Sequence, residues 1–351
     1  DGERRVETYT ASDVSGLAKV FTGLGWHRNS NQTGLPWWRC FWRATECNTE
    51  DQYWLPMSYY DNEHSVSLKR FLSVEVPAQS TPDPATSLRI ALDRLASHPN
   101  TAPFISKQLI QRLVSSNPSP EYVRDITSVF RNSGGNLGAV VKAILLHSEA
   151  LQPQTQAIDQ TAYGKIKEPI LRLTGVLRAL PHSSVNLGRT SSETQIGYYL
   201  ASTPDDASSS LGQGPMQSPS VFNFYSPTYP VPGTALVGPA FGIHNANTAL
   251  NRINYLNYLI FWNGSGASSS VPGAVGTRVD LSGFAADATD AGRLVDRISL
   301  LALGELRPAT SRTAVISAVN QFGSGTSSER TNRVRQAAFL VFASPQYHLV
   351  R

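Results

Sequence analysis

The sequence predicts a mainly α-helical, multi-helical domain with two irregular, loop-rich insertions and a few short strands. Apolar residues recur at helical spacing in a series of segments, helix-capping residues stand at several of their starts, and the links between neighbouring segments are short. The chain has 351 residues and is 40% hydrophobic, so it can bury a large core. Because short links favour packing of successive helices against each other, we expect one helical core.

Two segments without clear periodicity interrupt the helical pattern. The first is rich in aromatic residues, the second is rich in Ser, Gly and Pro, and both are too long for simple connections. We expect strands only within these insertions, one of them in 65–76. The predicted organisation is a first helix of the core within 1–24, an aromatic, disulfide-closed insertion at 25–81, the helical core at 82–181, a Ser/Gly/Pro-rich insertion at 182–243, and C-terminal helices of the same core at 244–351.

Capping signals help to place the helices. The first helix, over 8–24, has Ser12 and Asp13 as candidate caps, and the helix over 119–135 opens with Ser119 followed by Pro and Glu. The remaining predicted helices cover 84–99, 101–116, 136–150, 166–181, 244–262, 288–303, 309–322 and 328–343.

The charge balance argues against some classes of partner. There are 30 basic and 26 acidic residues without any run of Lys and Arg, which argues against nucleic-acid binding. The longest apolar stretches, such as 337–343, fall far short of the roughly 20 residues of a membrane span, so we expect no transmembrane segment. Only 16% of the residues are charged, against about 25% in typical soluble domains, and such an uncharged polar surface is common in secreted proteins.

The two cysteines of the chain, Cys40 and Cys47, lie in one short loop. A pair without further thiols and without C-x-x-C spacing fits a disulfide better than a zinc site. A disulfide implies an oxidising compartment. The alternative is two reduced thiols, one of them buried among aromatic residues. A bridge across so short a loop would add only about 2–3 kcal/mol, so its role would be to fix the local shape.

The same loop concentrates aromatic and basic side chains. Four of the six tryptophans lie within 36–54, and two arginines alternate with them. Indole rings can stack on sugars or on the apolar surface of a partner protein, and guanidinium groups can pair with carboxylate or sulfate. The alternative is a small local core in a segment with few aliphatic residues. The candidate binding residues of this loop are Trp37, Trp38, Arg39, Trp42, Arg43 and Trp54.

A second aromatic candidate is the stretch SPSVFNFYSPTYP at 218–230. Its prolines stiffen an extended backbone, so Phe222 and Tyr225 are candidates to line a binding groove. The alternative is a proline-braced loop that packs its rings over the helical core.

The strongest chemical candidate is the stretch MSYYDNEHSVSLKRFL. It places Asp61 and His64 within four residues, and carboxylate and imidazole groups are ligands for divalent metals. His27 and His244 are further histidines that could converge with them. The alternative role is structural, with His64 and Lys69 bonded so as to hold the loop on the helices. No cofactor is predicted, and a bound divalent metal is the alternative.

Five stretches cover much of the chain: YTASDVSGLAKVFTG (9–23), LDRLASHPNTAPFISKQLIQRLVSSNPSPEYVRDITSVF (92–130), GKIKEPILRLTGVLRA (164–179), SPSVFNFYSPTYPVPGTAL (218–236) and FLVFASPQYHLVR (339–351). These stretches resemble the bacterial domain of unknown function 1800 family. The resemblance implies a predominantly helical, secreted or periplasmic protein, often encoded beside a sulfatase-like partner family, and it implies no activity. It also implies that the chain is the C-terminal, larger part of the family unit, preceded by a further helical segment, so we do not expect Asp1 to be the translated start. The family's usual Gly after Phe-Leu is Ser73 here.

These observations favour an exported structural or interaction subunit that binds a partner protein or polysaccharide through the aromatic loop. The sequence has no G-x-S-x-G elbow after a strand and no nucleotide-binding glycine motif, which supports a role without catalysis. The expected partner is a co-exported sulfatase-like protein or the segment preceding this chain. Two alternatives are a metal-dependent hydrolase that acts on a cell-surface polymer and an accessory subunit of a larger multi-protein complex.

Overall fold

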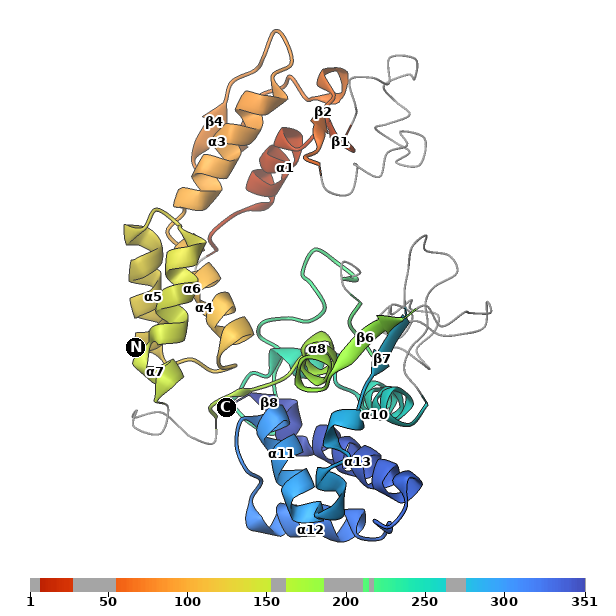
Figure 1. Ribbon diagram of the computed structural model, residues 1–351. Coiled ribbons are helices and arrows are strands. Elements are labelled where there is room, and N and C mark those ends of the chain that lie inside the picture. Colours follow the sequence, from red (N-terminus) through yellow and green to blue (C-terminus); the bar gives the residue numbers. More distant parts are fainter. Residues whose placement is uncertain are drawn as a thin grey trace, which may run out of the picture. The chain divides into compact units, whose positions relative to one another are not determined.

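The computed structural model describes residues 7–27, 55–152, 162–185, 211–214, 218–262 and 276–350. These residues are mainly helical, with a few short strands in two-stranded sheets, so the predicted fold class is confirmed (Figure 1). In this part of the chain, no helix is long and apolar enough to cross a membrane. The helices are α1 (Ala11–Val20), α3 (Pro84–Ser97), α4 (Thr101–Leu113), α5 (Pro120–Asn132), α6 (Leu137–Leu146), α7 (Ser148–Leu151), α8 (Pro169–Ala179), α10 (Ala246–Phe261), α11 (Ala291–Leu303), α12 (Ala309–Val319) and α13 (Ser327–Phe342).

Contacts between residues divide the chain into two compact units, Asp1–Ile105 and Ser106–Arg351. The boundary falls inside α4, where the helical pattern of the sequence continues without a break. For this reason the sequence contains no sign of the division.

In the first unit, α1 packs against an antiparallel hairpin of β3 (Lys69–Phe71) and β4 (Val74–Val76). The approach is so close that a Cβ atom on Gly16 would lie 1.7 Å from the carbonyl oxygen of Arg70, so a side chain cannot fit there. A second antiparallel pair joins β1 (Leu24–Gly25) to β2 (Ser58–Tyr59). The small core under these elements consists of Val20, Phe71, Val76 and Ala91.

The turn of the β3–β4 hairpin has an unusual backbone. Leu72 and Ser73 have φ angles of 47° and 64°, in the left-handed region that glycine adopts most readily. Asp13 Oδ1 accepts a hydrogen bond from the Leu72 amide at 2.7 Å, and Arg94 Nε donates to the Leu72 carbonyl at 2.8 Å. Side chains of α1 and α3 therefore hold the turn, and Ser73 occupies a position that favours glycine.

Capping side chains define the helix starts. Thr10 caps α1 in a reciprocal capping box with Asp13, so the predicted cap Ser12 is wrong and lies within the first turn. Ser119 caps α5 as predicted, because its hydroxyl accepts a hydrogen bond from the Tyr122 amide at 3.0 Å.

The predicted helix over 136–150 is two helices, α6 and α7. His147 stands between them with an extended backbone (φ −67°, ψ 145°), and its Nδ1 accepts a hydrogen bond from the Glu149 amide at 3.2 Å, which starts α7. The buried Tyr122 hydroxyl donates to the Ile144 carbonyl at 2.6 Å, and its ring stacks on the His147 ring at 4.2 Å between centroids. A tertiary contact therefore ends α6, and local sequence does not show it.

The second unit has two main apolar clusters. One lies where α4, α5 and α6 meet, and it contains Ile110, Tyr122, Ile126, Val140 and Ile144. The larger one joins α8, α10, α11, α12 and α13, and among its buried members are Val176, Leu256, Ile260, Leu294, Val295, Ile298, Val319, Val334, Val341 and Phe342.

Strands were expected only within the two insertions, and this expectation is wrong. In the second unit β5, β7 and β8 lie outside them, and β6 lies within the insertion at 182–243. β5 (Lys165–Ile166) pairs antiparallel with β8 (Leu349–Val350), which ties the end of the chain to the start of α8. β6 (His182–Val185) pairs antiparallel with β7 (Gly276–Val279). Strands of two to four residues are too short to show the alternating pattern that identifies a strand in sequence.

Candidate anion-binding site

Both cysteines and the tryptophans and arginines of the predicted binding loop lie outside the described residues. The disulfide and the aromatic binding loop therefore stay predictions. The residues concerned are Trp37, Trp38, Arg39, Cys40, Trp42, Arg43, Cys47 and Trp54.

In the first unit, His64 is buried and both of its ring nitrogens have partners. Nδ1 lies 2.8 Å from the carbonyl oxygen of Thr22, and Nε2 lies 3.0 Å from the hydroxyl of Ser87, so the ring bridges the end of α1 and the start of α3. Asp61 is exposed, and His27 Nδ1 lies 3.0 Å from a backbone carbonyl. Across the described ranges no group of three or more His, Cys, Asp or Glu side chains could hold a metal ion.

Lys69 is fully buried in the same region. Its Nζ lies 3.4 Å from the carbonyl oxygen of Ser67 and 3.5 Å from Oε1 of Gln79. Burial, with a smaller effect from Lys19, lowers the pKa of Lys69. These contacts match the structural role considered for His64 and Lys69, because both side chains bond to neighbouring backbone and polar groups of the first unit.

The two aromatic candidates of 218–230 have opposite environments. Phe222 is 81% exposed, whereas Tyr225 is buried beside Ile166. The guanidinium carbon of Arg112 lies 4.2 Å from the centroid of the Tyr225 ring. Tyr225 therefore packs in the core, and Phe222 is free to contact another molecule.

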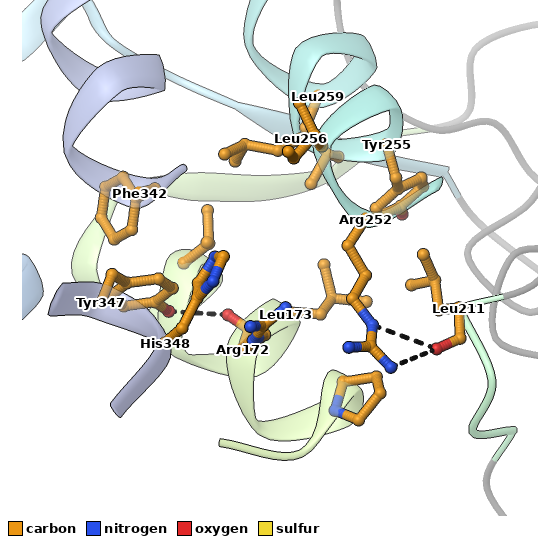
Figure 2. Close-up of a pocket in the computed structure, with 13 residues that line it drawn as sticks. Arg172, Leu173, Leu211, Arg252, Tyr255, Leu256, Leu259, Phe342, Tyr347 and His348 are labelled. Atoms are coloured by element: carbon orange, nitrogen blue, oxygen red, sulfur yellow. Dashed lines mark hydrogen bonds between the residues drawn. The ribbon is translucent and has the colours of Figure 1, made fainter. Parts of the chain in front are cut away.

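The second unit contains a small cavity of about 40 Å³ between α8, α10 and the last residues of the chain (Figure 2). Arg172, Tyr347 and His348 lie on one side of it, and Arg252 lies on the other. Ile253 is the exposed residue of the lining, His348 is half-buried, and the others are buried. The lining consists of Pro169, Arg172, Leu173, Val176, Leu211, Arg252, Ile253, Tyr255, Leu256, Leu259, Phe342, Tyr347 and His348.

Helical spacing places Arg172 on the buried face of α8, together with Leu173 and Val176. The backbone carbonyl of Arg172 accepts a hydrogen bond from the Tyr347 hydroxyl at 2.7 Å. Gly175 leaves room for this contact, since a Cβ atom there would lie 2.4 Å from the hydroxyl oxygen. The tyrosine therefore fixes the turn of α8 that carries Arg172.

The C-terminal residues reach the cavity through backbone pairing. The 3₁₀ turn Pro345–His348 leads into β8, and the Lys167 amide donates to the His348 carbonyl at 2.7 Å, next to the β5–β8 pair. Lys167 Nζ lies 4.2 Å from the centroid of the Tyr347 ring. His348 is therefore held beside the start of α8.

Arg252 of α10 has partners for its guanidinium group. Nε and Nη2 donate to the Leu211 carbonyl at 3.3 and 3.1 Å, and Nη2 also donates to the Ile243 carbonyl at 2.6 Å. Nη1 donates to Nδ1 of His244, which places the imidazole hydrogen on Nε2. All of these acceptors are neutral, so the charge of Arg252 is not balanced by them.

Arg172 differs from Arg252 in having no such partners. Its Nε and Nη2 atoms are buried and make no hydrogen bond, and the side chain as a whole is 6% exposed. Within the described ranges, neither Arg172 nor Arg252 forms an ion pair. Two buried guanidinium groups, one of them with free donors, therefore lie at one cavity.

The electrostatics of the cavity reflect this excess of positive charge. Burial lowers the pKa of Arg172 to about 10, and burial followed by the charge of Arg172 lowers the pKa of Arg252 to about 9. Burial, followed by the charges of Arg252 and Arg172, lowers the pKa of His244 to about 4. Burial, followed by nearby charges of which Arg172 is the largest, lowers the pKa of His348 to about 3. Burial and then Arg172 also lower the pKa of Lys167. At neutral pH both arginines are charged and both imidazoles are neutral.

The carboxylate of Glu168, at the start of α8, has its own partners. Oε1 lies 3.5 Å from Nη1 of Arg112, and Oε2 accepts a hydrogen bond from Gln213. Lys165, whose pKa is lowered mainly by burial, is also near enough to Glu168 for their charges to interact. Glu168 is therefore matched by neighbouring cations and does not compensate Arg172.

This arrangement suits an anion. Free donors of a buried guanidinium bind carboxylate, sulfate or phosphate oxygens strongly, because the charge-assisted hydrogen bonds form away from water. His244 was a predicted metal ligand, but its Nδ1 accepts from Arg252 and its neighbours are cations that repel a divalent metal. The position of His244 therefore favours an anion over a metal.

The sequence contains a signal for this site, although it is not a motif. Arg172 and Arg252 occupy core-facing positions of two amphipathic helices, and an arginine at such a position must have a partner or a function. No sequence pattern pointed to Tyr347 and His348, because the pairing of β8 with β5 brings them to the site from the end of the chain. Three of the stretches that resemble a known family, 164–179, 218–236 and 339–351, lie in the second unit, and the first and last of them line the cavity.

Comparison with known proteins gives one match. A family model described as a protein of unknown function (DUF1800) matches residues 2–349, nearly the whole chain and not only a C-terminal part. No curated protein and no solved structure matches the chain. The chain belongs to the DUF1800 family.

Proposed function

We propose that the protein is a binding subunit that captures one anionic group of a partner protein or polysaccharide in the cavity beside Arg172. The observation that supports this role is the pair of buried, unpaired donors on Arg172. A buried donor without a partner costs about 1–3 kcal/mol, so it is rarely kept without a purpose.

Two other buried arginines of the same unit provide an internal comparison. Arg307 donates to Ser344 Oγ at 3.1 Å and to Gln346 Oε1 at 3.2 Å. Arg333 donates to the Ala288 carbonyl at 2.7 Å and also bonds to Asn320. Both tie elements together through their terminal nitrogens, although their Nε atoms, like that of Arg172, make no hydrogen bond. Arg172 makes no such bond with its side chain, which supports a ligand-binding role.

The proposal includes export to the periplasm or outside the cell and a second contact through the aromatic loop. Its support is the polar, weakly charged composition, the presence of Cys40 and Cys47 in one short loop, and the tryptophans around them. A double variant, Cys40→Ser with Cys47→Ser, should stay folded and lose affinity for the partner. Full binding by that variant would remove the loop from the proposal.

The hydrolase alternative predicts stoichiometric metal that is lost on His64→Ala, and elemental analysis of the purified protein measures it. The alternative role in a larger complex predicts co-purification with further subunits. Either result would replace the simple binding role.

Surface plasmon resonance on immobilised dextrans tests the anion site itself. Carboxymethyl dextran, dextran sulfate and neutral dextran should be compared for the wild type, Arg172→Met and Arg124→Met. Arg124 is an exposed arginine of the same unit, 67% exposed and paired with Asp125, so its variant loses the same charge at the surface. We expect Arg172→Met to lose most binding to an anionic dextran and Arg124→Met to keep it. Equal binding by the two variants would contradict the proposal.

A further inference from the structure

We infer that the anion recognised at Arg172 is a carboxylate on a short aliphatic stem. This inference rests on the proposed function and narrows the chemistry of the group that the cavity accepts. Three features of the cavity support it: the geometry of the free donors, the volume, and the apolar character of the remaining wall.

The free donors form one edge of a guanidinium group. The N–H bonds of Nε and Nη2 of Arg172 lie in the plane of the guanidinium and point in parallel from one edge, which matches the two oxygens of a carboxylate. Arg252 uses its nitrogens on the carbonyls of Leu211 and Ile243 and on His244, so it contributes charge more than free donors. The same edge also binds sulfate or phosphate, but a tetrahedral anion would leave its further oxygens against the apolar wall without donors.

Folding has already removed these donors from water. An incoming carboxylate therefore gains hydrogen bonds without a further cost of desolvating Nε and Nη2. The nearby charge of Arg252 raises the attraction for any anion that enters. The site is thus preorganised for a single negative group.

The volume limits the size of the ligand. A cavity of about 40 Å³ has room for about three water-sized spheres, at roughly 10–15 Å³ for each. A carboxylate has three heavy atoms and fits, whereas a sugar ring does not. The ligand therefore inserts a carboxylate with a short stem, and the rest of the molecule stays outside.

The wall away from the arginines is hydrocarbon. Leu256, Leu259 and Phe342 lie in this wall (Figure 2). Ile253 is the exposed residue among those that line the cavity. Atoms behind the carboxylate meet these side chains, so methylene groups are favoured there over hydroxyls. Each methylene buried in such a wall strengthens binding about fourfold.

The carboxylate has two conceivable sources, a free small acid and the side chain of a partner's acidic residue. Both share the chemistry inferred here, and capped glutamate distinguishes them. N-acetylglutamate amide presents a carboxylate on two methylenes, and N-acetylglutamine amide has the same shape without the charge.

The test is thermal unfolding of the full chain at constant ionic strength, with formate, acetate, propionate, butyrate, sulfate or phosphate as the added sodium salt. The dissociation constant follows from the dependence of the unfolding midpoint on ligand concentration. We expect affinity to rise about fourfold per methylene from formate to propionate, with sulfate and phosphate weaker. Arg172→Met should weaken carboxylate binding at least tenfold, Arg172→Lys should restore only part of it, and Arg124→Met should bind as the wild type does.

Binding of capped glutamate but not capped glutamine supports a partner's side chain as the source, and binding of the free acids alone supports a small metabolite-sized acid. If sulfate or phosphate binds more tightly than every carboxylate, and only when Arg172 is present, the carboxylate inference is overturned and the proposed anion site is kept. If no anion distinguishes the wild type from Arg172→Met, both are overturned.

Discussion

Replacement of Arg172 by Met should make the unliganded protein more stable while it abolishes anion binding. The guanidinium group is buried with two free donors and lies near a second buried cation, so the folded protein carries an electrostatic cost there in the absence of a ligand. Met preserves much of the aliphatic volume and removes the charge and the donors. The hydrogen bond from Tyr347 goes to the backbone carbonyl of residue 172, so the substitution leaves it in place.

The expected magnitude follows from the two donors. Leaving a buried donor unpaired costs about 1–3 kcal/mol, and the two atoms share one side chain, so we expect a gain of about 1–3 kcal/mol in the free energy of unfolding. For a unit of this size, each kcal/mol raises the melting temperature by about 2–4 °C. The pKa of Arg252 should rise as well, because the neighbouring charge is gone.

Equilibrium unfolding in urea, in a chloride buffer without carboxylate, sulfate or phosphate, measures this difference. Arg307→Met is the matched control, because Arg307 is equally buried but bonds to Ser344 and Gln346, and its loss should destabilise the protein. If Arg172→Met lowers the unfolding free energy as much as Arg307→Met does, Arg172 is a structural residue and the reasoning is refuted.

Three further predictions concern the β3–β4 turn, the imidazoles of His244 and His348, and the glycine beside Tyr347. Ser73→Gly should raise the unfolding free energy by up to about 1 kcal/mol, because the φ angle of 64° at Ser73 strains any residue other than glycine. Chemical denaturation measures the difference, and a loss of stability would show that the Ser73 backbone is not strained. The unfolding free energy should fall as the pH drops from 6.5 toward 4. The lowered pKa values keep His244 and His348 neutral in the folded protein, while the same histidines take up protons in the unfolded chain. If replacing both histidines with Gln leaves this pH dependence unchanged, other groups control it. Gly175→Ala should destabilise by about 1–3 kcal/mol, because its Cβ meets the Tyr347 hydroxyl at 2.4 Å, and a wild-type melting temperature would show that the tyrosine moves freely.

Much of the fold could be predicted from the sequence, because helical periodicity and capping residues are local signals. Ser119 with the following proline marked the start of α5. The break at His147 could not be predicted, because a hydroxyl from another helix takes the carbonyl that would have continued α6. The strand at Lys165–Ile166 could not be predicted either, because its partner is the end of the chain, almost 200 residues away.

The site was less predictable for a related reason. Sequence motifs consist of groups close together in the chain, and such a group favoured His64, whose ring nitrogens bond to Thr22 and Ser87. Arg172 and Arg252 come from two helices and have no motif, and their meaning appears only when burial and hydrogen bonding are known. An arginine on the apolar face of a predicted helix is the sequence signal that would have found them.

The most direct test of the anion site is an experimental structure of the wild-type protein grown with propionate. We predict density for the carboxylate with its two oxygens about 2.7–2.9 Å from Nε and Nη2 of Arg172, and with its methyl end against Leu256 and Leu259. A carboxylate of the chain itself bonded to those nitrogens, or the same nitrogens unpaired with propionate bound elsewhere, would contradict it.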